Sequence, residues 1–290
     1  MNGMHASPSF NDMRPRLIRV AYRMLGSIAD AEDVVQDAYI RWLALDHESV
    51  RQPAALLRTI VTRLCLNELN SARRRRETYI GPWLPEPFIN ADEVDVMDDI
   101  TFPLMVALER LSPLERAAFL LHDVFGLAFD DVAEALDRKP STCRKLATRA
   151  RTHIHKARPR FPVSKEQGME FAAAFFAASR HGDMRKLRTL LADDVTAYSD
   201  GGGKVSASLV PLAGIHAVME RHAQLACDFS RSPSRLVRYA LIDGIPGFVT
   251  IEEGGLVQTT ALQIERGKII AIFITRNPDK LRHLDGVALH

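Results

Sequence analysis

Three prolines lie within eight residues, in the run GPWLPEPF at 81–88, and they divide the first half of the chain into two blocks. Proline removes a backbone donor and blocks the interior of a helix, so no continuous helix can pass through this run. Residues 81–106 also carry six acidic side chains and no basic one. We therefore predict an extended, acidic linker over residues 79–102, and we expect Trp83 within it to dock on a neighbouring domain.

The block before the linker, residues 8–78, has the periodicity of amphipathic helices. We expect Asp30 to cap a helix whose apolar residues recur at helical spacing as far as Leu45. The opposite face of this helix is polar and includes Asp33, Gln36, Asp37 and Arg41. A second helix is expected from Pro53 onward, ending in a basic run at 73–76, and its polar stripe comprises Arg58, Thr62, Arg63, Asn67, Asn70 and Arg74.

The block after the linker, residues 103–162, opens with a strong helix-start signature. Ser112-Pro113-Leu114-Glu115 is a capping box with proline at the first helical position, and we expect this helix to end near Gly126. Pro140 ends a second helix, and we expect Ser141 to cap a third one. The apolar stripe of the second helix is Phe129, Val132, Ala133 and Leu136. A short helix, a tight turn and a capped helix make a helix-turn-helix.

The charge pattern indicates that this motif binds DNA. Residues 138–160 carry nine basic side chains and no acidic one. The capped helix can enter the major groove N-terminus first, with its later cations meeting phosphates and its first residues facing base edges, namely Ser141, Thr142, Arg144 and Lys145. The basic run at 73–76 would supply a second contact with a polyanion. Charge alone leaves open an ordinary helical hairpin with solvated basic ends.

Residues 163–290 change in character. Two helices are expected, over 167–181 and 184–191, and strand-like alternation follows the glycine run at 201–203. Glycines at 244, 254–255 and 267 stand where hairpin turns should be, between the predicted strands 236–241, 247–252, 256–264 and 268–274. We predict an α+β domain in which a curved antiparallel sheet wraps on helices.

Other features limit the compartment and the cofactors. Cys65, Cys143 and Cys227 lie far apart, which argues against a disulfide framework and against a structural zinc site. The longest apolar run, 171–178, is too short to span a membrane, and the N-terminus has no secretory pattern. We expect a cytoplasmic protein that has no metal, no cofactor and no membrane contact.

Two stretches carry a resemblance to a known family. AEDVVQDAYIRW at 31–42, and LSPLERAAFLLHDVFGLAFDDVAEAL at 111–136 with the basic helix up to 158, resemble regions two and four of bacterial sigma factors. Region three is absent, as in the extracytoplasmic-function class. WLPEP at 83–87, DGGGK at 200–204 and NPDKL at 277–281 resemble the group forty-one type, whose C-terminal extension is a SnoaL-like cone.

The resemblance covers about residues 10–285 and has two departures. Ala128 stands where a Ser or Thr helix cap is usual, and Asp137 stands where glycine is usual. Each departure costs some stability or uses a left-handed turn that aspartate tolerates, and neither removes a DNA contact.

The resemblance also implies roles for the helical surfaces. The face with Asp33, Gln36, Asp37 and Arg41 would dock on the β′ coiled coil of core RNA polymerase, whose β flap is a further expected partner. The loop between Ala44 and Gln52 would trap a flipped base, although it offers His47 and no aromatic side chain. The −10 promoter element would be bound by Arg58, Arg63, Asn67, Asn70, Arg73 and Arg74. The −35 element would be bound by Ser141, Thr142, Arg144, Lys145, Thr148 and Arg149. The acidic linker would run toward the RNA exit path as a nucleic-acid mimic.

For the C-terminal domain two interpretations stay open. In the first, it regulates the chain in cis through an interface of Trp83, Leu84, Pro85, Glu86, Pro87, Asp200, Gly201, Gly202, Gly203, Lys204, Asn277, Pro278, Asp279, Lys280 and Leu281. In the second, it is an enzyme or a sensor, with candidate residues Tyr198, Asp200, His216 and His222 and a small-molecule pocket lined by Phe171, Phe175 and Phe176. We favour regulation without catalysis.

The alternative for the whole chain is a stand-alone DNA-binding regulator fused to a small-molecule-binding or enzymatic domain. Such a regulator would bind duplex promoter DNA tightly by itself, whereas a sigma factor should bind poorly without core polymerase.

Overall fold

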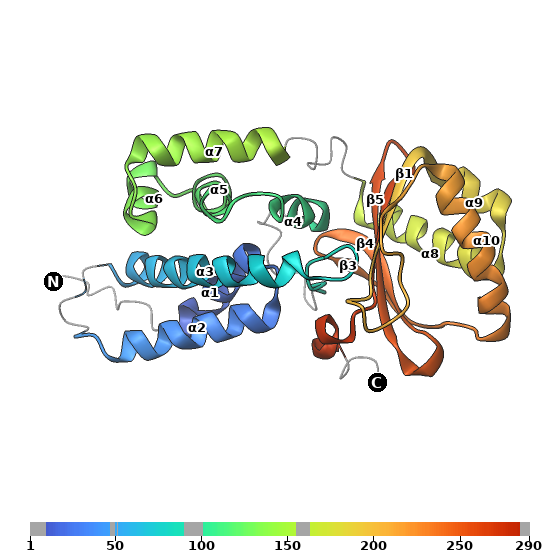
Figure 1. The fold of residues 1–290 in the computed structure, drawn as a ribbon, viewed down its shortest axis with the longest axis horizontal. Coiled ribbons are helices and arrows are strands. Elements are labelled where there is room, and N and C mark those ends of the chain that lie inside the picture. The colour runs from blue at the N-terminus through green and yellow to red at the C-terminus, as the bar shows by residue number, and fades with distance from the viewer. Residues whose placement is uncertain (1–9, 47–49, 51, 90–100, 155–162, 285–290) are drawn as a thin grey trace. The chain divides into compact units, whose positions relative to one another are not determined.

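The computed structural model describes residues 10–46, 50, 52–89, 101–154 and 163–284 (Figure 1). The chain divides into two compact units: a helical unit from Met1–Glu77 and Ala107–His155, and a mixed unit from Thr78–Val106 and Lys156–His290. Within the described ranges, no helix combines the length and the hydrophobicity that a membrane crossing requires.

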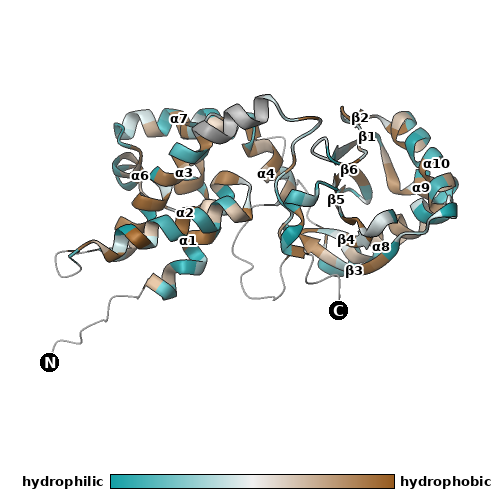
Figure 2. Ribbon diagram, turned by 60° about the horizontal axis from the view of Figure 1, so that its bottom comes forward, coloured by the Kyte–Doolittle hydropathy of each residue, from teal (hydrophilic) through white to brown (hydrophobic). Residues whose placement is uncertain are grey.

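The helical unit contains two groups of helices packed on one another. The first group is α1 (Phe10–Leu25), α2 (Ile28–Leu43) and α3 (Pro53–Glu77). The second group is α5 (Pro113–Phe119), a π turn (Leu120–Val124), α6 (Phe129–Leu136) and α7 (Pro140–Ile154). In Figure 2 the hydrophobic colouring of α1, α2 and α3 is concentrated where these helices face one another. Helix α4 (Phe102–Leu108) crosses the boundary between the units.

Two helix starts differ from the sequence prediction. Helix α2 begins at Ile28, because the Oγ atom of Ser27 accepts a hydrogen bond from the backbone N–H of Asp30 at 3.1 Å. Ser27, and not Asp30, is therefore the cap. Helix α7 begins at Pro140, one residue before the expected cap Ser141, since proline at the first helical position loses no hydrogen bond.

The remaining helix signals of the second group agree with the prediction. Ser112 and Glu115 form the reciprocal capping box at the start of α5. Asp137 has φ of 52° and ψ of 53°, which is the left-handed turn expected from its departure from the family pattern. Ala128 precedes α6 without a side-chain cap. The first helix, expected to end near Gly126, changes to a π turn at Leu120.

The mixed unit is built around one six-stranded sheet with the order β2-β1-β6-β5-β4-β3. The strands are β1 (Leu191–Asp200), β2 (Leu212–Ala213), β3 (Arg235–Ile242), β4 (Ile245–Ile251), β5 (Val257–Glu265) and β6 (Lys268–Thr275). Figure 1 shows three helices against one face of the sheet: α8 (Lys165–His181), α9 (Met184–Leu190) and α10 (Ile215–Arg231).

The two faces of the sheet have different hydrophobic cores. Alternate residues of the strands point to opposite faces, so Leu262 packs toward the helices while Ala261 packs toward the other side. On the helix side the core includes Phe175 of α8 and Val218 of α10. On the opposite side the core is completed by residues outside the sheet, namely Leu84, Ile89, Phe102, Leu281 and Leu284. The described residues of the linker are therefore part of the mixed unit.

The predicted α+β fold is confirmed, including the antiparallel order of β3, β4, β5 and β6. Left-handed residues form the expected hairpin turns at Asp243-Gly244 and Arg266-Gly267. The sheet is not wholly antiparallel, because β1 pairs parallel with β6. Sequence reasoning missed β1 and also missed α10, whose buried Ile215, Val218 and His222 follow a helical spacing.

Candidate functional site

Helix α7 presents one exposed polar face. Cys143, Ala147, Ala150 and Ile154 are buried at helical spacing, and this burial turns the opposite side of α7 outward. All six predicted −35 residues are exposed there: Ser141, Thr142, Arg144, Lys145, Thr148 and Arg149. The structure therefore brings these side chains together on one accessible, basic surface.

Two contacts orient the N-terminal part of that face. The guanidinium carbon of Arg144 lies 5.4 Å from the ring centroid of Phe129, and the hydroxyl of Thr148 donates to the carbonyl of Arg144 at 2.9 Å. The ring of Phe129 in turn stacks on His122 at 3.8 Å. Arg144 is thus held over an aromatic platform that comes from α6.

Helix α3 is engaged with the second group of helices. Arg63 donates to the carbonyls of Glu134 (3.0 Å) and Ala135 (3.3 Å) at the C-terminal end of α6. The carbonyl of Glu134 also accepts a weak bond from the N–H of Asp137 at 3.4 Å. Carbonyls at the C-terminal end of a helix carry partial negative charge, so a cation there is favourable. Asn67 is exposed and Arg58 is half-buried. The side chains of Asn70, Arg73 and Arg74, together with His47 and the acidic residues of 90–100, lie outside the described part.

Helix α2 exposes the predicted polymerase-binding residues together with an apolar patch that sequence reasoning missed. Asp33, Gln36, Asp37 and Arg41 are all exposed. Beside them, Tyr39, Ile40 and Leu43 are 40%, 59% and 59% exposed. Ile40 follows Asp37 by three residues and Gln36 by four, so it lies on the same helix face. The sequence signal that could have revealed this patch is the presence of large apolar residues outside the stripe of α2 that faces the core.

The three short motifs that carry the family resemblance meet around Asp200, which has no exposed surface. One carboxylate oxygen accepts from the hydroxyl of Tyr79 (2.5 Å) and the backbone N–H of Gly202 (3.1 Å). The other oxygen accepts from the backbone N–H of Leu84 (2.8 Å) and the Nζ atom of Lys280 (2.7 Å). The Asp200 carboxylate therefore accepts hydrogen bonds from all four of these donors.

Lys280 also connects the linker with the sheet domain. Its ammonium group also donates to the carbonyl of Leu84 and lies 3.9 Å from the ring centroid of Trp83. The Nδ2 atom of Asn277 donates to the Tyr79 hydroxyl at 2.8 Å. Burial, and next the adjacent Asp200 carboxylate, raises the pKa of Tyr79 well above its usual range, so the phenol stays protonated. We refer to Tyr79, Trp83, Leu84, Asp200, Asn277 and Lys280 as the linker junction.

The glycines of the DGGGK motif allow the close approach. Gly202 has φ of +60°, and a Cβ atom there would lie 2.3 Å from the Nδ2 atom of Asn277. At Gly203, with φ of +71°, a Cβ atom would lie 2.8 Å from Ile80. A Cβ atom at Gly201 would lie 2.3 Å from the carbonyl oxygen of Val205. A side chain at any of the three positions would force a neighbour to move, and at Gly202 and Gly203 it would also have to adopt a left-handed backbone conformation.

Phe88 and Ile89, which belong to the described part of the linker, also contact the sheet. Phe88 donates its N–H to the carboxylate of Asp243 at 2.9 Å and accepts from the N–H of Asp243 at 2.8 Å. Ile89 forms a β-bridge with Ile242. Pro85 and Pro87 are buried, Glu86 is half-buried, and Pro278 is exposed. Lys204 and Asp279 form an exposed ion pair that lowers the pKa of Asp279.

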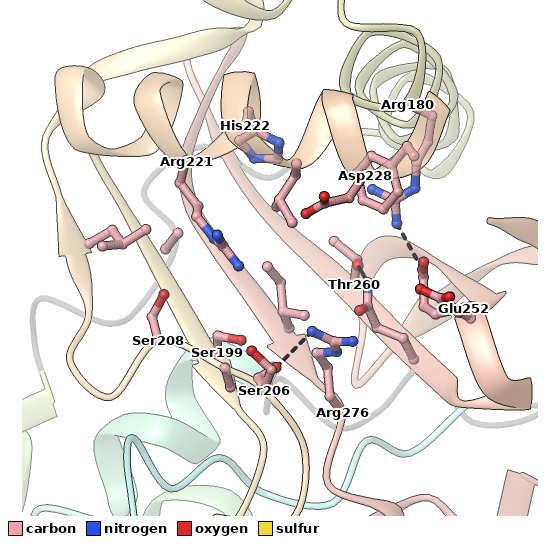
Figure 3. Close-up of a pocket in the computed structure, with 18 of the residues that line it drawn as sticks. Arg180, Ser199, Ser206, Ser208, Arg221, His222, Asp228, Glu252, Thr260 and Arg276 are labelled. Atoms are coloured by element: carbon pink, nitrogen blue, oxygen red, sulfur yellow. Dashed lines mark hydrogen bonds and ion pairs between the residues drawn. The ribbon is translucent and has the colours of Figure 1, made fainter. Parts of the chain in front are cut away.

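The candidate residues for catalysis do not converge. Tyr198 packs toward the linker side of the sheet, where its ring stacks on Phe273 at 5.3 Å. Asp200 is fully used by the linker junction, and His216 is exposed. Only His222 lines the cavity on the helix side of the sheet (Figure 3). Of the three predicted phenylalanines, Phe175 lines this cavity, whereas Phe171 and Phe176 pack against the core. The described residues include no cluster of three or more His, Cys, Asp or Glu side chains suited to a metal ion.

Comparisons with known proteins agree with this architecture. Family models match two segments: Sigma-70 region 2 over residues 10–75 and Sigma-70, region 4 over residues 102–154. The chain is 36% identical over 287 residues to the ECF RNA polymerase sigma factor SigJ of Mycobacterium tuberculosis, covering 93% of this chain and 91% of that protein. It is 30% identical over 282 residues to the probable ECF RNA polymerase sigma factor SigI of the same species, covering 95% and 94%. The crystal structure of the M. tuberculosis SigJ matches with a TM-score of 0.75 at 34% identity, over 94% of this chain and 97% of that one.

Proposed function

The chain belongs to the extracytoplasmic-function family of RNA polymerase sigma factors, and on that premise we propose which of its surfaces contact polymerase, contact promoter DNA and control both. As a member of this family it is an alternative sigma factor, which binds core RNA polymerase and directs it to promoter DNA. Its C-terminal α+β domain is the fused SnoaL-like extension. We expect it to act in the cytoplasm, where core polymerase is.

The exposed face of α7 is our proposed −35 contact. Ser141, Thr142, Arg144 and Lys145 would face base edges, while Thr148 and Arg149 would meet the sugar-phosphate backbone. The exposure of all six side chains on one face supports this assignment. The −10 contact is assigned to α3, with Arg58, Arg63 and Asn67 in its described part. Arg63 would have to release the carbonyls of Glu134 and Ala135 to reach DNA. Asn70, Arg73 and Arg74 extend that assignment along the same helix.

Helix α2 is the proposed site for the β′ coiled coil of core polymerase. Asp33, Asp37 and Gln36 offer acceptors to a basic partner helix, and the neighbouring Ile40 and Leu43 offer apolar area for burial. The second helical group would contact the β flap. In both contacts the partner would cover surface that the isolated chain leaves exposed.

The linker junction is the proposed element of control in cis. The residues of the linker connect α3 with the helices of region four, and Asp200 together with Lys280 holds its beginning on the SnoaL-like domain. A linker held in this way has a shorter reach than a free one. Since promoter elements lie at a set spacing, we propose that docking of the linker restrains promoter binding. The four hydrogen bonds to the buried Asp200 carboxylate are the observation that carries this proposal.

Run-off transcription with core polymerase tests the proposal. The wild-type chain is compared with Asp200→Asn, with a 1–162 truncation and with Asp193→Asn, which alters an exposed ion pair with Arg188 away from the linker junction. We expect wild type and the Asp193 control to initiate equally, and the other two to form open complexes more readily on a selected promoter pool. Lower initiation by Asp200→Asn than by wild type would mean that docking of the linker activates promoter binding instead of restraining it. No initiation by any form would remove the promoter assignments.

A further inference from the structure

The mixed unit contains a cavity of about 490 Å³ between the sheet and helices α8 and α10, on the face opposite the linker. Figure 3 shows charged side chains entering it from several elements. Arg180 comes from α8, Arg221 and His222 come from α10, and Arg276 follows β6. The proposed sigma-factor function uses none of these residues.

Four of the arginines that the structure describes line this cavity, and two of them have a carboxylate partner: Arg180, and Arg231, which pairs with Asp228 at 3.1 Å. Arg180 pairs with Glu252 at 3.0 Å and lies 4.0 Å from the ring centroid of Phe229. Arg276 donates to a neutral acceptor, the carbonyl of Ser206, at 2.7 Å. Arg221 has a 3.5 Å contact with the side chain of Gln224. Among the described residues no carboxylate lies within ion-pair distance of either Arg221 or Arg276.

Several buried nitrogen atoms in the cavity lack a hydrogen-bond partner in the described part of the chain. The Nε atoms of Arg180 and Arg276 and the Nδ1 atom of His222 are buried without a partner among the residues that the structure describes. The His222 residue is only 5% exposed. Burial of unpaired polar groups is costly, so such groups point to a ligand that supplies acceptors.

The electrostatics favour a negative charge at this position. Burial lowers the pKa values of Arg180 and Arg276, and the Glu252 carboxylate offsets part of this effect at both groups. Arg221 lowers the pKa of Arg276 further, and Arg276 lowers that of Arg180. Burial, and next the positive charges of Arg180 and Arg221, lowers the pKa of His222 to about 4. The cations of the cavity are therefore close enough to repel one another, and an anion placed among them would relieve this repulsion.

The cavity also has apolar walls, formed by Phe175, Leu212, Val218, Leu225 and Ile274. Inorganic anions would leave these walls uncovered, whereas a carboxylate with an apolar body would satisfy both parts of the lining. We propose that the cavity binds a small organic carboxylate with an aromatic or aliphatic body, its charge lying between Arg221 and Arg276.

The position of Arg276 connects this site to the linker junction. The backbone N–H groups of Arg276 and Asn277 both donate to the carbonyl of Asp200, at 2.8 Å and 3.0 Å. A ligand that pairs with Arg276 competes with its bond to Ser206, which lies two residues after Lys204 of the DGGGK motif. Occupancy should therefore alter the surroundings of Trp83. An effect of the ligand on transcription rests on the proposed function, but its binding does not.

Isothermal titration of the full chain, without polymerase, tests the proposal. The probes are acetate, benzoate and 2-naphthoate, each beside its neutral amide. We expect affinity to rise from acetate to 2-naphthoate, and 2-naphthamide to bind about tenfold more weakly than 2-naphthoate, because charge-assisted hydrogen bonds to a buried guanidinium are lost. Equal binding of acid and amide, or no binding of any carboxylate, would overturn the proposal.

Three variants assign the site. Arg221→Met and Arg276→Met should each weaken 2-naphthoate about tenfold or more, while Arg185→Met, the same change at an exposed position of α9, should leave binding unchanged. Equal weakening by all three variants would indicate a non-specific charge effect and contradict the assignment. The comparison of acid with amide on the wild-type chain stands even if a cavity variant does not fold. If 2-naphthoate binds the wild-type chain but does not change run-off transcription, the result contradicts only the proposed role of the linker and not the binding site.

Discussion

Asp200 shows how one buried carboxylate can hold two segments together. Its two oxygens accept four hydrogen bonds, and Lys280, itself 7% exposed, is its ion-pair partner. Asp200→Asn would place an NH₂ group against existing donors and would leave Lys280 without its counter-charge. We expect the free energy of unfolding of the mixed unit to fall by about 3–5 kcal/mol.

Urea unfolding followed by the fluorescence of Trp83, in a Trp42→Phe background, measures this loss. Asp193→Asn is the matched control, because the Arg188–Asp193 pair is exposed and should be worth less than about 1 kcal/mol. Similar losses in the two variants would contradict the special role assigned to Asp200.

His222 gives a prediction about pH. Its pKa is lowered to about 4 in the folded chain, chiefly by burial, whereas an unfolded histidine titrates near about 6.5. Between these values the unfolded state binds more protons, so stability falls as the pH is lowered. The loss attributable to His222 should reach about 2 kcal/mol at pH 5.

Urea unfolding at pH 7 and pH 5 tests this sign and size. His222→Gln should lose the His222 component of the pH dependence, while His216→Gln, at an exposed position of the same helix, should keep it. Identical pH dependence in wild type and His222→Gln would show that the imidazole is not held neutral.

At the scale of elements, the DGGGK motif needs glycine because its backbone lies close to the segment that contains Asn277. Gly202 and Gly254 both have left-handed φ values, +60° and +74°, but a Cβ atom meets Asn277 at Gly202 and nothing within 4 Å at Gly254. Both alanine variants bear the conformational cost, about 1 kcal/mol, and only Gly202→Ala bears the clash in addition. We expect Gly202→Ala to be the less stable of the two in urea unfolding. Equal stability would mean that Asn277 moves freely.

Helix α7 carries the prediction on promoter recognition. If Arg144 or Lys145 makes a bidentate contact with a base, alanine in its place should cost about 1–3 kcal/mol of promoter binding and relax the −35 sequence preference. The measurement is selection of promoter sequences by the holoenzyme. Arg151→Ala, which removes a pair with Asp123 at 2.7 Å near the end of α7, is the control. A uniform loss across all sequences would assign the residue to phosphate contact instead.

For the whole molecule, the prediction concerns dependence on polymerase. A sigma factor should bind a promoter duplex poorly alone and specifically with core polymerase, since polymerase positions its DNA-binding surfaces. Gel mobility shifts of one promoter, with and without core enzyme, check this over a range of salt concentrations. Tight, specific binding by the chain alone would fit the alternative of a DNA-binding regulator with a fused domain.

Local sequence determined much of this protein. Proline spacing predicted that no helix passes through residues 81–88, Ser112 and Glu115 predicted a helix start, and strand alternation with glycine turns predicted the meander from β3 to β6. These features depend on neighbouring residues, where capping, turn geometry and hydrophobic period act directly. The exposed face of α7 follows from the same helical period.

Contacts between distant segments were decided only by the tertiary structure. Strand β1 needs its parallel partner β6, Arg63 meets α6 from 71 residues away, and Asp200 meets Leu84 from 116 residues away. The charged cavity likewise gathers residues from α8, α10 and the end of β6. Local propensity carries no information about such pairings, because their free energy comes from burial and from satisfying polar groups once the chain is folded. The motifs were visible in the sequence, but their common centre at Asp200 was not.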